Sequence, residues 1–223
     1  LESSVEKLKT LFGVKADKPP TDRKLPPREK ILWAINNGLE LAKKVAGAKD
    51  IIRSKGFFDG PVGKRAFETV IEALELASLP FYPANLNFQS YNAAAPVDNS
   101  KELLKLVKDE RYNIFIDIFF GIILHTFHNI IQEKPDVVGI SIPSMPQMLA
   151  GMTLGHLIKD AGLDTHIVVG GPHISMLREE LPKVPRIFEL FDSAVVFDGE
   201  VPLLKLVEAI SNKQDFSTVP NLI

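Results

Sequence analysis

The spacing of apolar residues divides the chain into a helical first part and a second part that alternates strands with helices. In the first part, apolar positions recur every three or four residues, which is the period of an amphipathic helix. This pattern predicts helices over residues 3–12, 28–47, 63–78, 100–110 and 113–133. The glycines and proline of residues 50–63 predict a loop, and the alternation in residues 85–91 predicts a short strand.

From Lys134 onward, short continuous apolar runs alternate with helical stretches. The runs PDVVGIS, HIVVGG and SAVVFDGE predict three buried strands, and the stretches after them predict a helix ending at Gly162 and helices over 174–181 and 201–210. Three strand–helix units with short connections favour parallel strands with right-handed crossovers. We therefore expect an α/β fold, with a doubly wound parallel sheet over residues 134–223. A helix-rich region, residues 1–133, precedes the sheet and packs on it or belongs to the same domain.

Composition narrows the classes of function. The chain has 26 basic and 28 acidic residues and a net charge of −2, so its overall charge does not suggest binding to nucleic acid or to an acidic membrane surface. It has no cysteine, which excludes disulfides, thiolate-bound zinc and iron–sulfur clusters held by these 223 residues, and which fits a cytoplasmic location. The apolar stretch 114–131 is interrupted by Asp117, His125, His128 and Asn129, so it predicts a buried helix rather than a membrane span.

Unusual residues follow each predicted strand, at the edge where open parallel sheets bind ligands. They are Ser141, Gly170-Gly171 and residues 198–200. A single glycine is enough for a tight turn, whereas two in succession leave a flat backbone over which a planar group can lie. Ser141 also suits a helix cap or a local turn, and Glu200 also suits the positive end of the helix that follows it.

Three further motifs are better explained without a ligand. His125 and His128 have a spacing that metal ligands use, but there is no HExxH motif and no carboxylate cluster beside them, so we expect no metal site. His173 follows the double glycine, where an exposed histidine near a helix start is the simpler interpretation. GMTLG at 151–155 lies in a predicted helix and lacks the Lys-Ser/Thr of a phosphate loop, so it predicts close helix packing.

The segments PDVVGISIPSMPQ, HIVVGGPH and DSAVVFDGEVPLLKLVEAI resemble the cobalamin-binding, Rossmann-like domain that precedes the catalytic barrel of radical S-adenosylmethionine enzymes. That family carries the pattern D-x-H-x-x-G, then S-x-L, then G-G. Ser141-Ile142-Pro143 stands at the S-x-L position, with Pro143 in place of leucine. The 26 residues 144–169 then lead to Gly170-Gly171, which is the spacing that the pattern expects.

The resemblance implies where the cofactor is held. In the family, the serine hydroxyl and the glycine backbone receive the nucleotide tail of cobalamin, and a Cβ at the glycines would collide with its benzimidazole. The residues of this chain that the resemblance assigns to cobalamin are Ser141, Ile142, Pro143, Ser144, Gln147, Gly170, Gly171, Pro172, His173, Gly199 and Glu200. It assigns no catalytic residue and no metal ligand to this chain.

Departures from the family pattern carry expectations of their own. No D-x-H-x-x-G occurs, so we expect no histidine lower ligand to cobalt. Phe197-Asp198 precedes Gly199-Glu200 where the family has GEGE. The family's first strand–helix units are not clearly present, and we expect them on the N-terminal side of Leu1.

By the same resemblance, the partner of this domain is a C-terminal radical S-adenosylmethionine barrel of the same polypeptide. That barrel would hold S-adenosylmethionine and a 4Fe-4S cluster and would act as a methyltransferase or modify peptides or metabolites. The chain itself would bind cobalamin without being catalytic.

Two alternatives remain open. The first is a structural or interaction domain that kept the fold and lost the cofactor. The second is a flavodoxin-like or receiver domain, which is disfavoured because Asp136 lies at a strand start rather than at a strand end. On the sequence alone, Gly171→Val is expected to abolish cobalamin retention with a modest loss of stability if cobalamin binds, and only to destabilise the fold if it does not.

Overall fold

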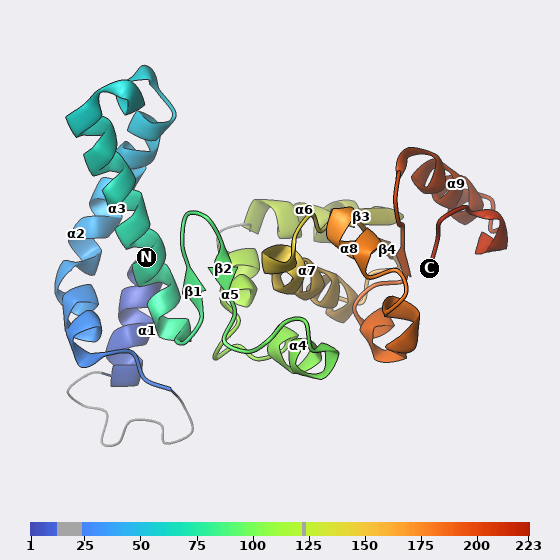
Figure 1. The fold of residues 1–223 in the computed structure, drawn as a ribbon, viewed down its shortest axis with the longest axis horizontal. Coiled ribbons are helices and arrows are strands. Elements are labelled where there is room, and N and C mark those ends of the chain that lie inside the picture. The colour runs from blue at the N-terminus through green and yellow to red at the C-terminus, as the bar shows by residue number, and fades with distance from the viewer. Residues whose placement is uncertain (13–23, 122–123) are drawn as a thin grey trace. The chain divides into compact units, whose positions relative to one another are not determined.

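The computed structural model describes residues 1–12, 24–121 and 124–223. The chain separates into two compact units, Leu1–Ala94 and Ala95–Ile223, and each is described by itself (Figure 1). The change of pattern predicted at residue 134 marks the start of the strands, whereas the second compact unit begins earlier, at Ala95.

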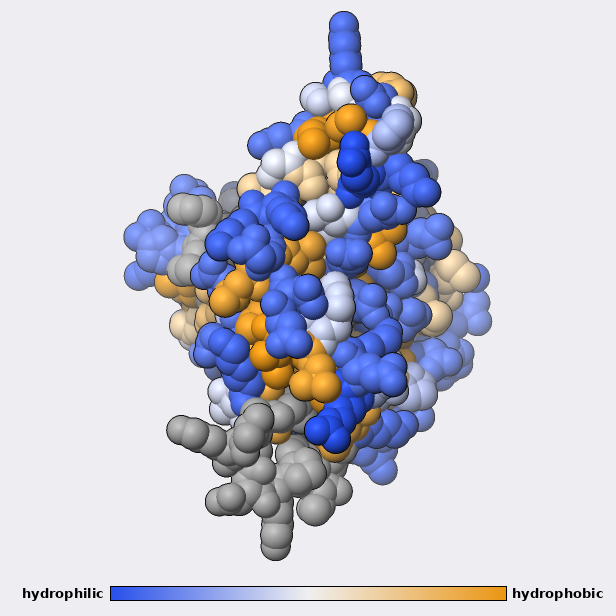
Figure 2. All heavy atoms as spheres, turned by 90° about the vertical axis from the view of Figure 1, so that its left-hand side faces the viewer, coloured by the Kyte–Doolittle hydropathy of each residue, from blue (hydrophilic) through white to orange (hydrophobic). Residues whose placement is uncertain are grey.

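The first unit is a helical hairpin with a short helix against it. It contains α1 (Glu2–Phe12), α2 (Arg28–Ile52) and α3 (Gly60–Ser78), which confirms three of the predicted helices. Its core gathers apolar side chains from all three helices and the turn that follows them: Val5, Leu8, Ala34, Leu41, Ala73, Leu76 and Leu79. Figure 2 views the molecule from the side of this unit and shows mostly hydrophilic atoms interrupted by apolar patches.

The loop predicted over residues 50–63 is wrong in large part. Helix α2 continues to Ile52, a 3₁₀ turn covers Lys55–Phe58, and α3 already begins at Gly60. The glycines in this segment predicted a loop, but at least one of them allows close packing instead. A Cβ on Gly63 would lie 1.9 Å from the carbonyl oxygen of Phe57, so only glycine lets that turn close against α3. The predicted strand at 85–91 is instead a small antiparallel hairpin, β1 (Asn85–Leu86) and β2 (Tyr91–Asn92).

The second unit opens with α4 (Ser100–Val107), α5 (Ile114–Gly121) and α6 (Leu124–Glu133). The helix predicted over 113–133 corresponds to α5 and α6, and residues 122–123 lie outside the described residues. The buried Asn113 precedes α5 and donates to Thr153 Oγ1 at 2.8 Å, which fixes the start of that helix on α7 (Met148–Asp160). In the parts of the chain that the structure describes, no helix combines the length and apolar character that crossing a membrane requires.

Three parallel strands form the sheet of the second unit, in the order β3-β4-β5. They are β3 (Val137–Ser141), β4 (His166–Gly170) and β5 (Ser193–Ala194). Helix α7 (Met148–Asp160) connects β3 to β4, α8 (Pro172–Met176) follows β4, and α9 (Glu200–Ser211) follows β5. The predicted α/β class, with a helix-rich region before a parallel sheet, is therefore confirmed.

Helices pack on both faces of this sheet. On one face, Ile140 contacts α7 at its two glycines. A Cβ on Gly151 would lie 2.6 Å from Ile142 Cδ1, and a Cβ on Gly155 would lie 2.4 Å from the carbonyl oxygen of Leu190. The predicted packing role of GMTLG is thus confirmed. On the other face, Val168 packs with Leu206 and Ala209 of α9.

The strands are shorter and more exposed than predicted. The strand predicted over SAVVFDGE is limited to Ser193–Ala194, and the next residue, Val195, forms an isolated antiparallel bridge with Leu222. In β3 only Ile140 is buried, because this strand has a single neighbour, β4, among the described strands. The helix predicted over 174–181 is α8, which ends at Met176.

Candidate functional site

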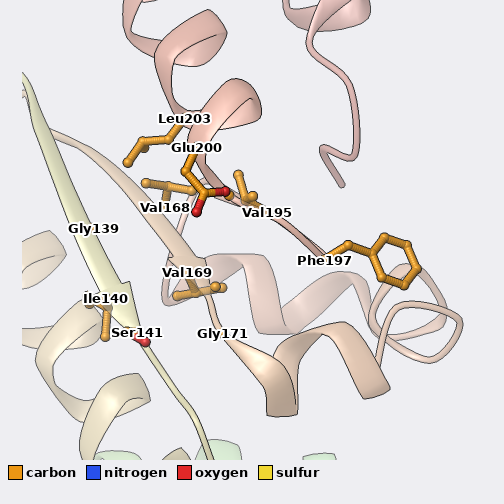
Figure 3. Close-up of a pocket in the computed structure, with 12 residues that line it drawn as sticks. Gly139, Ile140, Ser141, Val168, Val169, Gly171, Val195, Phe197, Glu200 and Leu203 are labelled. Carbon is orange, nitrogen blue, oxygen red and sulfur yellow. The ribbon is translucent and has the colours of Figure 1, made fainter.

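A cavity of about 460 Å³ lies at the carboxyl ends of the strands, on the face of the sheet that carries α9 (Figure 3). All three strand ends contribute to it, together with the first turn of α9. Parallel register places Ser141 of β3 directly beside Gly170 of β4. The predicted binding edge therefore coincides with a real hollow.

The floor of the cavity is made of small residues. Gly139, Ser141 and Gly170 all border it, and a Cβ built on Gly139 would meet no atom within 4 Å. Gly139 is also exposed and has no positive φ, so neither crowding nor backbone conformation requires glycine there. A glycine inside a strand weakens the strand and often marks the close approach of a ligand or another backbone. Gly139 keeps open a space that any side chain would fill.

The walls are apolar apart from one carboxylate. Val168, Val195 and Leu203 border the cavity, and among its described lining residues Glu200 alone has a charged side chain (Figure 3). Glu200 begins α9, after Gly199 at the N-cap position, so the positive end of the helix favours its charge as predicted. Apolar walls with a few polar groups are typical of sites for small organic molecules.

The two adjacent glycines have different physical causes. Gly171 has φ +104°, and a Cβ there would lie 2.9 Å from the carbonyl oxygen of Ile142 and 3.1 Å from its nitrogen. Gly170 has no positive φ, and its Cβ would lie 3.3 Å from the carbonyl oxygen of Val195. The main chain of Ile142 holds this turn, since its N–H donates to the carbonyl oxygen of Gly170 at 2.8 Å. The fold by itself accounts for Gly171, so Gly171→Val cannot separate a binding domain from one that lost its ligand.

One hydroxyl group joins the glycine turn to the loop after β5. Ser175 Oγ donates to the carbonyl oxygen of Gly171 at 3.2 Å and accepts the N–H of Phe197 at 2.7 Å. Phe197 has φ +66°, which is rare for a bulky residue. Its exposed ring points away from the other labelled residues in Figure 3 and lies 5.5 Å from the guanidinium of Arg178. This rim of the cavity therefore has a defined but strained backbone.

The strained backbone at Phe197 predicts that glycine is more stabilising than alanine at this position, which is the reverse of their usual order. Phe197→Gly is expected to be about 1 kcal/mol more stable than Phe197→Ala, because only glycine adopts positive φ without steric cost. Both variants remove the ring and its contact with Arg178, so that loss cancels in the comparison. Urea unfolding of the two variants measures the difference, and equal stability, or a more stable alanine variant, would contradict a left-handed backbone at this position.

The predicted cofactor-binding residues fall into two groups. Those that border the cavity are Ser141, Gly170, Gly171, Gly199 and Glu200. Those that do not are Ile142, Pro143, Ser144, Gln147, Pro172 and His173. Within the second group, Ile142 is fully buried, and the exposed Ser144 donates to Gln147 Oε1 at 2.9 Å. The binding roles of the whole set stay predictions.

No metal centre replaces the cavity as a candidate. The side chain of His125 lies outside the described residues, and His128 is exposed. Across the described residues, no group of three or more His, Cys, Asp or Glu side chains converges on a point where a metal ion could bind.

Several residues that line the cavity were not predicted from the sequence. Gly139, Val168, Val195, Phe197 and Leu203 border the cavity, yet none was proposed as a site residue. A signal existed for Gly139, because a lone glycine within an apolar strand indicates a bulge or a close backbone approach. The apolar residues give no such signal, since a valine in a strand is ordinarily part of the core.

The comparisons with known proteins address the second half of the chain. Residues 101–207 match the family described as B12 binding domain. No curated protein and no solved structure matches the chain. The matched segment begins in α4, ends in α9 and includes every residue that borders the cavity. The similarity to the B12 binding domain family therefore covers residues 101–207 of this chain, just under half of its length.

Proposed function

We propose that the second unit binds cobalamin and that the cavity receives its nucleotide tail. The observation that carries the proposal is Gly139, a strand glycine that opens onto the cavity and that nothing in the fold requires. It lies within the segment that matches the B12 binding domain family.

The residues present suit such a tail. Glycine and serine floor the cavity, so a planar base can approach the backbone of β3 and β4 without meeting a side chain. Val168, Val195 and Leu203 offer apolar contact to that base, and the Ser141 hydroxyl offers a hydrogen bond. The volume of about 460 Å³ lies within the roughly 300–1,000 Å³ that small-molecule sites occupy. Bound cobalamin supplies a cobalt centre that carries alkyl groups, and the role proposed for this chain is to hold and orient it.

Titration with hydroxocobalamin tests the proposal. The full chain is mixed with the cofactor, freed of unbound ligand by gel filtration, and examined by its visible spectrum. We expect one cobalamin per chain and a spectrum without histidine coordination to cobalt, because no D-x-H-x-x-G occurs in the sequence. Cobalamin that elutes entirely apart from the protein would refute the proposal.

Cobinamide, which lacks the nucleotide tail, tests where the tail lies. If the tail fills the cavity, cobinamide is expected to bind at least about tenfold more weakly than hydroxocobalamin, a loss of about 1.4 kcal/mol. Equal affinities would place the binding energy on the corrin ring and remove the cavity from the proposal.

We further propose that the parent protein is a radical S-adenosylmethionine enzyme whose barrel follows this domain. Support comes from the resemblance of PDVVGISIPSMPQ, HIVVGGPH and DSAVVFDGEVPLLKLVEAI to the domain that precedes such barrels. The S-adenosylmethionine and the 4Fe-4S cluster would then belong to that barrel, as would any methyl-transferring or peptide-modifying activity. Reading the gene downstream of Ile223 for CxxxCxxC tests this, and its absence there would refute the proposal.

A second candidate function is an interaction domain that retained the fold without the cofactor. The explanation of Gly171 by the fold alone favours this candidate, because the double glycine then needs no ligand. It does not explain Gly139, which the fold leaves free to be any other residue.

A further inference from the structure

A second hollow in the same unit is lined by cations. It has a volume of about 550 Å³ and lies between α4 and two 3₁₀ turns, η4 (Leu181–Lys183) and η5 (Pro185–Glu189). It shares no lining residue with the cavity at the strand ends. The two hollows are therefore separate sites.

The cations come from both sides of this hollow. Lys101 and Lys105 of α4 and Lys108, the residue that caps its C-terminal end, line it at positions i, i+4 and i+7, which share one helical face. Lys183 and Arg186 line it from the two 3₁₀ turns. Glu189 is the single carboxylate of its described lining, although the whole chain carries a net charge of −2. The excess of positive charge is thus local to this hollow.

These cations are available to a ligand at small cost. Lys105 pairs with Glu102 at 2.8 Å, Lys183 with Glu180 at 2.8 Å and Arg186 with Glu189 at 3.1 Å. Each pair joins exposed side chains three residues apart, and such pairs contribute little to stability in water. Lys101 and Lys108 form no ion pair with any described residue. Like charges spaced along one helical face repel each other, and a bound anion would relieve that repulsion.

The hollow also has an apolar part. Leu104, Val184 and Pro185 line it between the cations, which suits a ligand with a planar or apolar portion next to its anionic groups. The N–H groups of Lys101 and Glu102 already donate to Asn99 Oδ1, so the side chains, and not the start of α4, form the site.

From this arrangement we infer a binding site for a small phosphorylated molecule with an apolar or planar part. The three lysines along one face of α4 and its C-terminal end hold the phosphate groups, together with Lys183 and Arg186. Phosphate groups match ammonium and guanidinium donors in charge and geometry. The apolar residues between the cations add contacts that inorganic polyphosphate cannot make.

ATP and inorganic tripolyphosphate serve as probes, because they share the anionic part and differ in the apolar part. The full chain is titrated with each by calorimetry in about 0.15 M salt, where weak attraction between exposed charges is largely screened. ATP is expected to bind at least about tenfold more tightly than tripolyphosphate. Absence of ATP binding would overturn the site, and equal binding of the two probes would overturn its apolar part.

A matched pair of variants locates the site. The double variant Lys101→Gln/Lys108→Gln removes two positive charges that hold no ion pair among the described residues, so the fold is expected to remain intact. It is expected to weaken ATP binding at least about tenfold. The control, Lys43→Gln/Lys205→Gln, makes the same change of charge at exposed lysines elsewhere and is expected to leave binding unchanged. Equal effects of the two doubles would show that binding is unspecific and overturn the site.

His156 of α7 offers a local readout. Burial lowers the pKa of its imidazole most, and the positive charge of Lys108 lowers it further. An anion held beside Lys108 offsets that charge, so the pKa of His156 is expected to rise when ATP saturates the site. Proton NMR titration of the imidazole measures the rise, and an unchanged value would place the bound anion away from Lys108.

Discussion

The Gly139→Val variant is expected to fold at least as stably as the natural chain and to bind cobalamin at least about tenfold more weakly, a loss of about 1.4 kcal/mol. Valine favours a strand more than glycine does, on a scale that spans about 1 kcal/mol. The Cβ of the new side chain meets no atom within 4 Å, so its methyl groups extend into the cavity. Equilibrium dialysis against hydroxocobalamin measures the affinity, and calorimetric melting measures the stability.

A helix glycine in the other unit provides the control. Gly47 of α2 also has no atom within 4 Å of its Cβ position, so Gly47→Ala is expected to raise stability by about 1 kcal/mol. It lies outside the matched family segment and is expected to leave cobalamin affinity unchanged. Undiminished affinity in Gly139→Val would remove the tail from the cavity. A lower melting temperature of that variant would show that the strand itself requires the glycine.

Gly171→Ala is expected to be the most damaging small substitution at the site, at a cost of about 2–4 kcal/mol. Gly171 has φ +104° and ψ 171°, a conformation that is essentially restricted to glycine. The new Cβ would also lie 2.9 Å from the carbonyl oxygen of Ile142, a backbone atom that cannot easily move. The cost arises in the fold and is therefore present without any ligand.

Gly170→Ala is the matched control for that experiment. Its Cβ would lie 3.3 Å from the carbonyl oxygen of Val195 and the backbone is unstrained, so the expected cost is below about 1 kcal/mol. The only tryptophan of the sequence, Trp33, belongs to the first unit, so its fluorescence would report on the unfolding of that unit and not on the sheet of the second unit. Hydrogen exchange of the β4 amides reports on the sheet directly. Equal costs for the two variants would contradict the different explanations given for the two glycines.

Periodicity was enough to predict most of the helices and the parallel strands of the sheet in their order along the chain. Helices α1 to α4 were predicted from apolar residues at helical spacing. Strands β3 and β4 were predicted from apolar runs that are too short for a helix and that have proline or glycine at their ends. The site edge could be predicted as well, because parallel strands joined by helices must end on the same side of their sheet. Ser141 and Gly170 therefore meet as expected.

Features that depend on distant contacts could not be predicted. The antiparallel bridge between Val195 and Leu222, next to the end of β5 at Ala194, is a contact that no local pattern of residues encodes. The conformation of Phe197 runs against the preference of its own residue type and is fixed from outside by the Ser175 hydroxyl. The role of Gly139 could be recognised only from the structure, which shows that the position of its missing Cβ opens onto the cavity.

The two edges of the described sheet differ. On the β5 side, the C-terminal residues pair with it, since Ala194 and Ile223 exchange both of their backbone hydrogen bonds at 2.8 Å. The outer edge of β3 has no partner among the described strands, so a fourth strand, from elsewhere in the polypeptide or from another molecule, can pair there. It would then run alongside Gly139 and border the cavity. Strand addition and ligand binding would share that border, so any effect of one on the affinity of the other must be reciprocal.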